Sequence, residues 1–449
     1  MVVTEYGIEQ LDLAIKNQKI VSIERMLNEN EQALKEIDAK GLHILPGLID
    51  SHVHFDEPGR AEREGFSTGS ACLAASGVTT FFDNPISSDP PVIHSEGFWL
   101  KREAAEQNSL LDFGILGGLV RENREELFAL MEQGVVAFKG FMSNNTGLKE
   151  FSYLDDTSLI LGMEKIAEMG AILILHAESE VICSHLAAKN KNLGKNSFLD
   201  YEASRPVASE VEAVERAAAF AEATNCKIHI FHASSREVVK AVKRAKARGV
   251  DITVETCPHY LSLIVDDFPK LAGATCSPPL RTRAHVESLW EAIKKDEIDT
   301  IGSDHSSMPL ENGVYGGLSG GQSTLSVLLE EGYFARGISL DTIARLTSIQ
   351  PAKRFNLYPQ KGAIVIGSDA DLALIDLNQE TILKKDDLFN RHQHSPYIGK
   401  RMRGGVTHTI SRGEIIYVRG EMTGKSGRGE MVIKNSGLLK DLPNGIPIK

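Results

Sequence analysis

Eight short apolar segments, each followed by a stretch of helical period, constrain the fold of this chain more than any other feature. Continuous apolar strands that alternate with helices are typical of a parallel sheet covered by helices. A doubly wound open sheet would normally stop at about five to seven strands, whereas eight units match a (β/α)8 barrel. We therefore predict an α/β fold built on this barrel. The apolar segments are residues 43–55, 77–85, 111–119, 135–142, 171–179, 227–235, 251–261 and 299–306.

The helical segments between the strands carry recognisable ends. Residues 208–225 and 235–249 have apolar residues at helical spacing. Each is expected to begin at a serine cap and to end at an asparagine or a glycine, as helices prefer.

The two ends of the chain have a different pattern, with short β-rich stretches and glycine-containing turns. Residues 11–25 are expected to form a hairpin that turns at Asn17 and Gln18, and residues 361–377 and 407–421 are also β-rich. Because neither end is long enough to bury a core alone, we predict one small β-sandwich domain formed from both. The expected segments are 1–43 (sandwich), 44–357 (barrel, ending in the helix-rich stretch 323–357) and 358–449 (sandwich, then a surface tail from 422).

Composition excludes several classes of partner. The chain has 449 residues and a net charge of −12, which argues against nucleic acid or an anionic membrane as the main partner. The 5 cysteines are scattered and odd in number, as in reduced intracellular proteins. The N-terminus lacks the basic and apolar regions of a signal peptide, and no apolar run approaches the roughly 18 residues of a membrane span. We therefore expect a cytoplasmic protein.

Six polar side chains stand at the predicted carboxyl ends of the barrel strands, where (β/α)8 enzymes carry their chemistry. Taken singly, a histidine there is more often a hydrogen-bonded core residue, a lysine can snorkel and an aspartate can cap a turn. Convergence of all six at one rim favours a site for Zn²⁺ or a similar transition metal. The six are His52, His54, Lys139, His176, His232 and Asp304.

Lys139 is the most informative of the six because it lies in the apolar run Ala-Phe-Lys-Gly-Phe. A buried ammonium costs several kcal/mol unless it is paired. Carbamylation by CO₂ would convert this cation into a carboxylate able to bridge two metal ions.

A set of motifs in this order resembles the amidohydrolase superfamily and, within it, the cyclic amidohydrolases. The resemblance implies that His52, His54 and Asp304 hold one metal ion and that His176 and His232 hold a second. Carbamylated Lys139 and a hydroxide would bridge the two ions, which are Zn²⁺ or, depending on supply, Mn²⁺, Co²⁺ or Fe²⁺. Asp304 would act as general base and then general acid. The motifs are PGLIDSHVHFDEPGR, GVTTFFDNP, FKGFM, ILHAES, IFHASS, TVETCPHYL, CSPPLR, GSDHS and GSDADLALID.

Sequence differences between this chain and each subfamily indicate which substrate it takes. Dihydroorotases carry an arginine that grips the substrate carboxylate where this chain has Asp56, and an anion there would repel a carboxylate. Hydantoinases and dihydropyrimidinases place a tyrosine shortly after the lysine strand, whereas here the first is Tyr153. The segment HFDEPGRAEREGFSTG is closest to the allantoinase form, although Asn84, Ser87 and Gly321 depart from that form at positions expected in the pocket.

The resemblance therefore implies a hydrolase that opens a cyclic ureide ring, with allantoin as the first candidate substrate. Hydantoins or dihydropyrimidines are the alternative. A non-catalytic scaffold is disfavoured because all six ligand positions are filled. A homodimer or homotetramer is implied. Members of the family usually begin with a further strand, so either the start of this chain is displaced or that strand is absent. Candidate substrate contacts are Asn84, Ser143, Asn145, His259, Ser277, Gly317 and Gln322.

Overall fold

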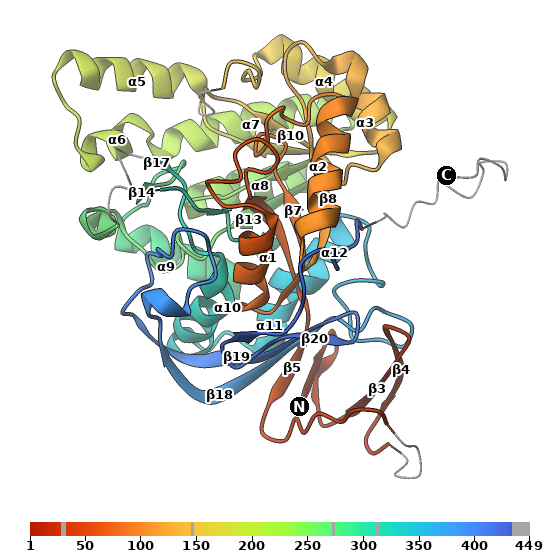
Figure 1. Cartoon of the computed structure of the whole chain (residues 1–449). Helices are drawn as coiled ribbons and strands as arrows, with labels where there is room; N and C mark the ends of the chain where they lie inside the picture. The colour runs from red at the N-terminus through yellow and green to blue at the C-terminus, as the bar shows by residue number, and fades with distance from the viewer. Residues whose placement is uncertain (28–32, 145–147, 272–273, 310–314, 433–449) are drawn as a thin grey trace, which may run out of the picture.

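In the computed structural model the described residues are 1–27, 33–144, 148–271, 274–309 and 315–432. Their central feature is a closed ring of parallel strands at eight positions, as predicted (Figure 1). The third position is divided between two short strands, one paired with each neighbour. The eighth is divided in the same way, and its second part closes the ring on the first strand. In order, the strands are β6 (Leu48–His54), β7 (Val78–Asp83), β8 (Asp112–Ile115) with β9 (Gly117–Gly118), β10 (Phe138–Phe141), β11 (Ile172–His176), β12 (Lys227–Ile230), β13 (Ile252–Thr256), and β15 (Thr300–Ile301) with β16 (His305–Ser306).

Helices follow the strands and cover the outside of the ring (Figure 1). The end predicted for α7 is confirmed, since its C-cap is Asn225 with a left-handed φ of 57°. The serine cap predicted for α7 is wrong: the N-cap is Pro206, and the Ser209 hydroxyl lies one turn inside, donating to the Pro206 carbonyl. The helices are α1 (Phe66–Ala74), α2 (Ser95–Asn108), α3 (Leu127–Gln133), α4 (Asp156–Glu168), α5 (Glu180–Asn192), α6 (Phe198–Ser204), α7 (Val207–Thr224), α8 (Arg236–Ala247) and α9 (Arg283–Lys294).

Both ends of the chain meet in one antiparallel-rich sheet below the barrel (Figure 1). A hairpin packs against this sheet and turns at Asn17 and Gln18, whose φ values are 51° and 69°. Apolar residues of hairpin and sheet, including Ile20 and Ile44, share one buried cluster, so the predicted two-layer β-structure from both termini is present. The sheet order is β2 (Gly7–Glu9), β1 (Val2–Thr4), β5 (His43–Pro46), β18 (Leu372–Ile382), β19 (Arg401–Ser411), β20 (Glu414–Val418) and β21 (Glu421–Met422), and the hairpin is β3 (Asp12–Lys16) with β4 (Lys19–Glu24).

The predicted β-rich stretch 361–377 is strand only from Leu372 onward. The residues before it form turns, with Gly362 and Gly367 at positive φ, and they gather two aspartates around the buried Lys361. The helix-rich stretch predicted at 323–357 is confirmed as a series of short helical turns. It comprises η3 (Gly321–Ser323), α10 (Thr324–Val327), η4 (Leu328–Phe334), α11 (Leu340–Ala344), η5 (Arg345–Ile349) and α12 (Gln350–Arg354).

The expected tail is only partly described, because residues 433–449 lie outside the described residues. The part before them runs beside β8, where the Phe113 amide donates to the Glu430 carbonyl and the Val432 amide to the Phe113 carbonyl. The remaining short elements are η1 (Arg124–Glu126), η2 (Val265–Lys270), β14 (Ala274–Thr275), β17 (Tyr315–Gly316) and η6 (Lys385–Asp387).

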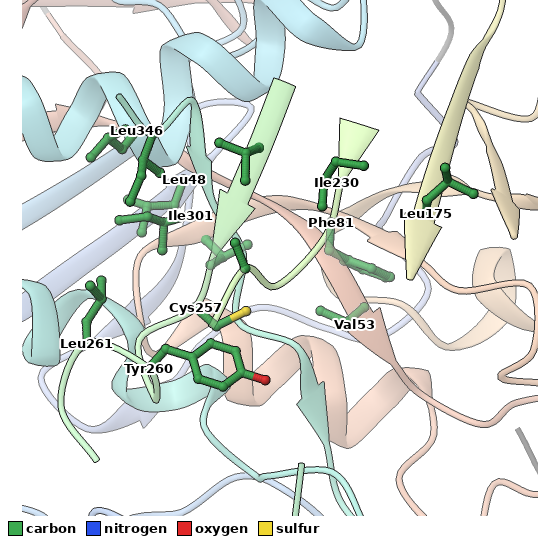
Figure 2. Close-up of a cluster of buried hydrophobic side chains, with 14 of the residues drawn as sticks. Leu48, Val53, Phe81, Leu175, Ile230, Cys257, Tyr260, Leu261, Ile301 and Leu346 are labelled. Atoms are coloured by element: carbon green, nitrogen blue, oxygen red, sulfur yellow. The ribbon is translucent and has the colours of Figure 1, made fainter. Parts of the chain in front are cut away.

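The core between the barrel strands and the surrounding helices is apolar. Val53, Phe81, Leu175 and Ile230, from four barrel strands, belong to one continuous cluster of buried side chains (Figure 2). Close packing of this kind fixes where each strand ends, and so fixes the polar residues that follow it. None of the described helices is both long and apolar enough to cross a membrane.

Candidate metal centre

Two histidines and an aspartate form a compact cluster at the carboxyl end of the barrel. His52 and His54 project to one side of β6, and Asp304 lies between β15 and β16 with a φ of 51°. Oδ1 of Asp304 is 3.1 Å from Nε2 of His52 and 3.3 Å from Nε2 of His54. One donor atom from each lies within 4.8 Å of the others, which is a spacing that a single divalent cation can span.

Two further histidines stand beside this cluster. His176 ends β11 and His232 follows β12 at a φ of 44°. Their ring centres are 4.5 Å apart, and the His232 ring is 5.3 Å from that of His52. Burial, with smaller contributions from neighbouring cations, lowers the pKa of both His52 and His232, so these imidazoles are neutral and able to bind metal.

Lys139, on β10, completes the constellation. Its ammonium nitrogen lies 4.0 Å from the centre of the Phe231 ring and 5.0 Å from that of Phe141. It is buried, and within the described part of the chain Nζ has no hydrogen-bond partner. Burial lowers the pKa of Lys139 to about 7, although Asp304 and Glu255 favour its charged form. An unpaired buried amine beside four imidazoles fits a metal centre better than it fits a structural core.

Two carboxylates that the sequence analysis missed orient these histidines. Oε1 of Glu255 accepts from Nδ1 of His52 at 2.9 Å and Oε2 accepts from Ser51, which leaves Nε2 of His52 facing Asp304. Such hydrogen bonds fix the tautomer of a metal-binding histidine. The available signal was a glutamate inside the apolar run of β13, where a buried carboxylate needs a partner.

Glu178 plays the equivalent part for the second pair. Oε2 of Glu178 lies 2.8 Å from Nε2 of His176, and it also accepts from Arg205 and from the Ser277 hydroxyl. Burial alone would raise the pKa of Glu178, but Arg205 and His176 outweigh this and lower it to about 2. Glu178 is therefore ionised and holds the His176 ring through Nε2.

A pocket of about 180 Å³ opens onto this centre, which suits a small heterocycle rather than a large ligand. Two predicted substrate contacts, Ser277 and Gly317, line it. His259 is buried within electrostatic range of Asp304 and His232, and burial lowers its pKa to about 4 although Asp304 opposes this. The metal-site side chains also line the pocket. The remaining lining residues are Asp56, Arg60, Arg63, Ile86, Ser87, Phe141, Leu148, Ser306 and Met308.

The remaining predicted contacts lie elsewhere or are not described. Asn84 is buried with its amide on the Val53 carbonyl, and Ser143 is likewise buried without lining the pocket. Asn145 falls outside the described residues. The Gln322 amide donates to the Asp387 carbonyl and accepts from the Phe389 amide. Gln322 therefore binds a loop of the β-domain and does not reach the pocket.

That loop, residues 387–397 between β18 and β19, lies across loops of the barrel mouth, and we refer to it as the strap. Asn390 donates to the hydroxyls of Ser307 and Ser319. His394 donates to the carbonyl of Met308, a pocket residue. The strap thus connects the β-domain to the loop that follows Asp304.

In the loop after β6, Glu57 and Arg60 have different partners. Glu57 accepts from the Phe66 amide and the Asn108 side chain. Arg60 pairs with Asp56 at 3.6 Å. Glu57 thus faces the start of α1.

The fold and these side chains define a barrel protein with a cluster of candidate metal ligands at the carboxyl ends of its strands. The sequence model of the amidohydrolase family matches residues 43–416. A protein named allantoinase from Solibacter usitatus is 44% identical over 95% of this chain and 94% of its own length. One of the same name from Deinococcus radiodurans is 42% identical, covering 96% and 97%. The solved structure of L-hydantoinase (dihydropyrimidinase) from Arthrobacter aurescens has a TM-score of 0.93 at 31% identity, covering 96% of this chain and 98% of that one.

The chain therefore belongs to the amidohydrolase family, as the motifs predicted. It is a cyclic amidohydrolase in fold and in sequence.

Proposed function

We propose that this enzyme hydrolyses the ring amide of allantoin to give allantoate. The observation that carries the proposal is similarity over nearly the whole chain: relatives named allantoinase reach 44% identity, whereas the hydantoinase structure shares 31%. A small pocket with charged and hydroxyl side chains on its wall, beside the candidate metal ligands, supports a small polar ring as substrate.

We infer that the centre holds two divalent ions, Zn²⁺ in the first instance and Mn²⁺, Co²⁺ or Fe²⁺ as alternatives. His52, His54 and Asp304 would hold one ion, and His176 and His232 the other. Lys139, carbamylated by CO₂, would hold both. When bound, the ions supply Lewis-acid activation of water and of the ring carbonyl. The unpaired amine of Lys139 and the neutral imidazoles support this assignment.

The chain's own groups supply proton transfer and orientation. Asp304 stands within 3.3 Å of both histidines of β6 and faces the pocket, so it can take a proton from the attacking water. It then returns this proton to the ring nitrogen that leaves. Ser277 and Gly317, which line the pocket, would orient the ring. Glu255 and Glu178 hold the imidazoles in fixed tautomers throughout.

The first test is steady-state ring opening of allantoin by metal-supplemented enzyme, run beside hydantoin, dihydrouracil and dihydroorotate. We expect the highest kcat/KM for allantoin. Preference for a hydantoin or dihydropyrimidine would favour the second candidate, which the structural similarity to hydantoinases supports. Dialysis against a chelator should remove activity, and added Zn²⁺, Mn²⁺ or Co²⁺ should restore it.

We also propose that the enzyme is cytoplasmic and forms a homodimer or homotetramer. Exposed apolar side chains on neighbouring outer helices, Trp99 on α2 and Phe128 on α3, support self-association. Light scattering coupled to size exclusion measures the assembly directly. A monomer at micromolar concentration would contradict the proposal.

A further inference from the structure

The loop after β6 brings three charged side chains to the wall of the pocket. Asp56, Arg60 and Arg63 all line the cavity that the candidate metal ligands also line. Asp56 is buried, and one of its oxygens lies 3.6 Å from Arg60 and 3.7 Å from Arg63. Two cations against one anion leave this wall with a net charge of +1, so it favours a hydrogen-bond acceptor on the ligand.

The two arginines have different surroundings. Nη2 of Arg60 donates to the carbonyls of Ile86 and Ser88 at 2.5 and 2.9 Å, so Arg60 ties its loop to the loop that follows β7. Arg63 makes no such bond: Asp56 is its one ion-pair partner within the described residues, and 3.7 Å is beyond hydrogen-bond distance. The Arg63 side chain is 35% exposed, against 13% for Asp304 and 2% for His52. Arg63 therefore lies on the solvent side of the pocket with its donors available.

We propose that Arg63 is a specificity-determining residue that binds a polar acceptor group attached to the ring, outside the amide that is hydrolysed. This inference rests on the proposed function of the site, for which the acceptor is the carbonyl oxygen of the ureido substituent of allantoin. A guanidinium can donate two converging hydrogen bonds to the two lone pairs of such an oxygen. Asp56 holds the guanidinium over the pocket through its charge. A ring without a substituent has nothing at this position.

We expect Arg63 to discriminate between substrates and not to take part in the hydrolytic reaction itself. The Arg63 side chain is more exposed than the candidate metal ligands, which are buried or half-buried, so we expect its loss to leave the reacting amide unaffected. Binding energy from a remote group that is the same in ground and transition states appears in KM. A hydrogen bond to a charged group contributes enough to change affinity by about tenfold or more.

The test compares Arg63→Gln with the unchanged metal-loaded enzyme on two rings. We measure kcat and KM for allantoin, and the inhibition constant of hydantoin, which has no substituent, as a competitor of allantoin hydrolysis. We expect KM for allantoin to rise by about tenfold with kcat nearly constant, and the inhibition constant of hydantoin to stay within about twofold. Arg63→Lys, which keeps the charge but not the planar donor pair, should show an intermediate KM. The matched control is Arg102→Gln on the outer face of α2, because that side chain is also 35% exposed.

An equal loss of affinity for allantoin and hydantoin in Arg63→Gln would overturn the inference, since it would indicate a general disturbance of the pocket. Unchanged KM for allantoin would overturn it as well. If the unchanged enzyme opens hydantoin but not allantoin, the proposed function fails separately. Arg63 is then tested with hydantoin-5-acetate, whose carboxylate replaces the ureido oxygen as the acceptor. A loss confined to hydantoin-5-acetate would support the inference, and no selective loss would overturn it.

Discussion

At the scale of single residues, the centre depends on what becomes of the Lys139 amine. It is buried between two aromatic rings and, in the described structure, has no hydrogen-bond partner. A free amine in this place would be unfavourable, whereas a carbamate would complete two metal coordination spheres. We therefore predict that Lys139→Ala abolishes both activity and the two-metal site. Metal analysis of the purified variant beside the unchanged enzyme measures the loss, and two ions per chain with normal turnover would contradict the bridging role.

Asp304 is expected to contribute proton transfer more than structure. Its side chain contacts two histidines and the open pocket, and it makes no contribution to the apolar core. Asp304→Asn should lower kcat by about 10²- to 10⁴-fold, with the unfolding temperature little changed. The control is Asp299→Asn, five residues earlier, whose carboxylate pairs with Lys246 and does not line the pocket. Near-normal turnover in Asp304→Asn would exclude it as the essential base.

The six proposed ligands could be predicted from the sequence because a parallel barrel brings all its strand ends to one rim, whatever the details of packing. Glu178, Glu255 and Arg63 could not be predicted in the same way. Their roles depend on which neighbouring side chain each one meets, and those neighbours lie on other strands or loops. The same is true of Gln322, which was predicted as a substrate contact but binds the strap.

At the scale of elements, the strap connects the β-domain to the loops around the pocket. Asn390 is buried and bonds two serines of the barrel loops as well as the His394 carbonyl. Asn390→Ala should destabilise the protein by about 1–3 kcal/mol, because it leaves buried polar partners unsatisfied. It should also raise KM, since His394 holds the loop of Met308 at the pocket.

Limited proteolysis and steady-state kinetics together test this role. Faster cleavage within residues 387–397, with a raised KM, is the expected pattern. Asn378→Ala on β18 is the matched control, because Asn378 is exposed and is not one of the residues that make the strap contacts. If Asn390→Ala were cleaved no faster and bound substrate normally, the strap would be a passive connection.

Strand positions were predictable to within a few residues, but strand pairing was not. The repeated apolar pattern gave all eight barrel positions, yet the split of the third and eighth positions depends on the register of the neighbouring strands. The late start of β18 has a similar origin. Residues 361–371 are β-rich in composition, but their aspartates are drawn into turns by Lys361.

At the scale of the whole molecule, a buried ionic cluster joins the barrel to the small domain that we assign to residues 1–43 and 358–449. Lys361 pairs with Asp112 at the start of β8 and with Asp369 and Asp371 ahead of β18. Arg412, on the turn after β19, lies 3.2 Å from Asp112. A sequence pattern can predict that two domains exist, but this contact unites residues about 250 positions apart and has no local signature.

Removing the central cation should reveal what this cluster contributes. The carboxylates around Lys361 raise its pKa, while burial raises the pKa of Asp371 despite the attraction of Lys361. Lys361→Met would leave buried like charges, and should cost about 3–5 kcal/mol of the free energy of unfolding at pH 7. Without Lys361 the carboxylates would have raised pKa values and would bind more protons in the folded state than in the unfolded state. Stability of the variant should therefore increase as the pH falls from 7 towards 5.

Chemical denaturation at several pH values measures this trend in the variant and in the unchanged enzyme. Lys243→Met is the control, because Lys243 forms an exposed ion pair with Glu297 and should cost less than about 1 kcal/mol at any pH. A Lys361→Met protein whose stability matched that of this control, with no gain at lower pH, would show that Arg412 alone compensates the aspartates. The expected opposite outcome would mean that charge helps to hold the terminal domain to the barrel. It would also mean that lowering the pH reduces the stability lost when Lys361 is removed.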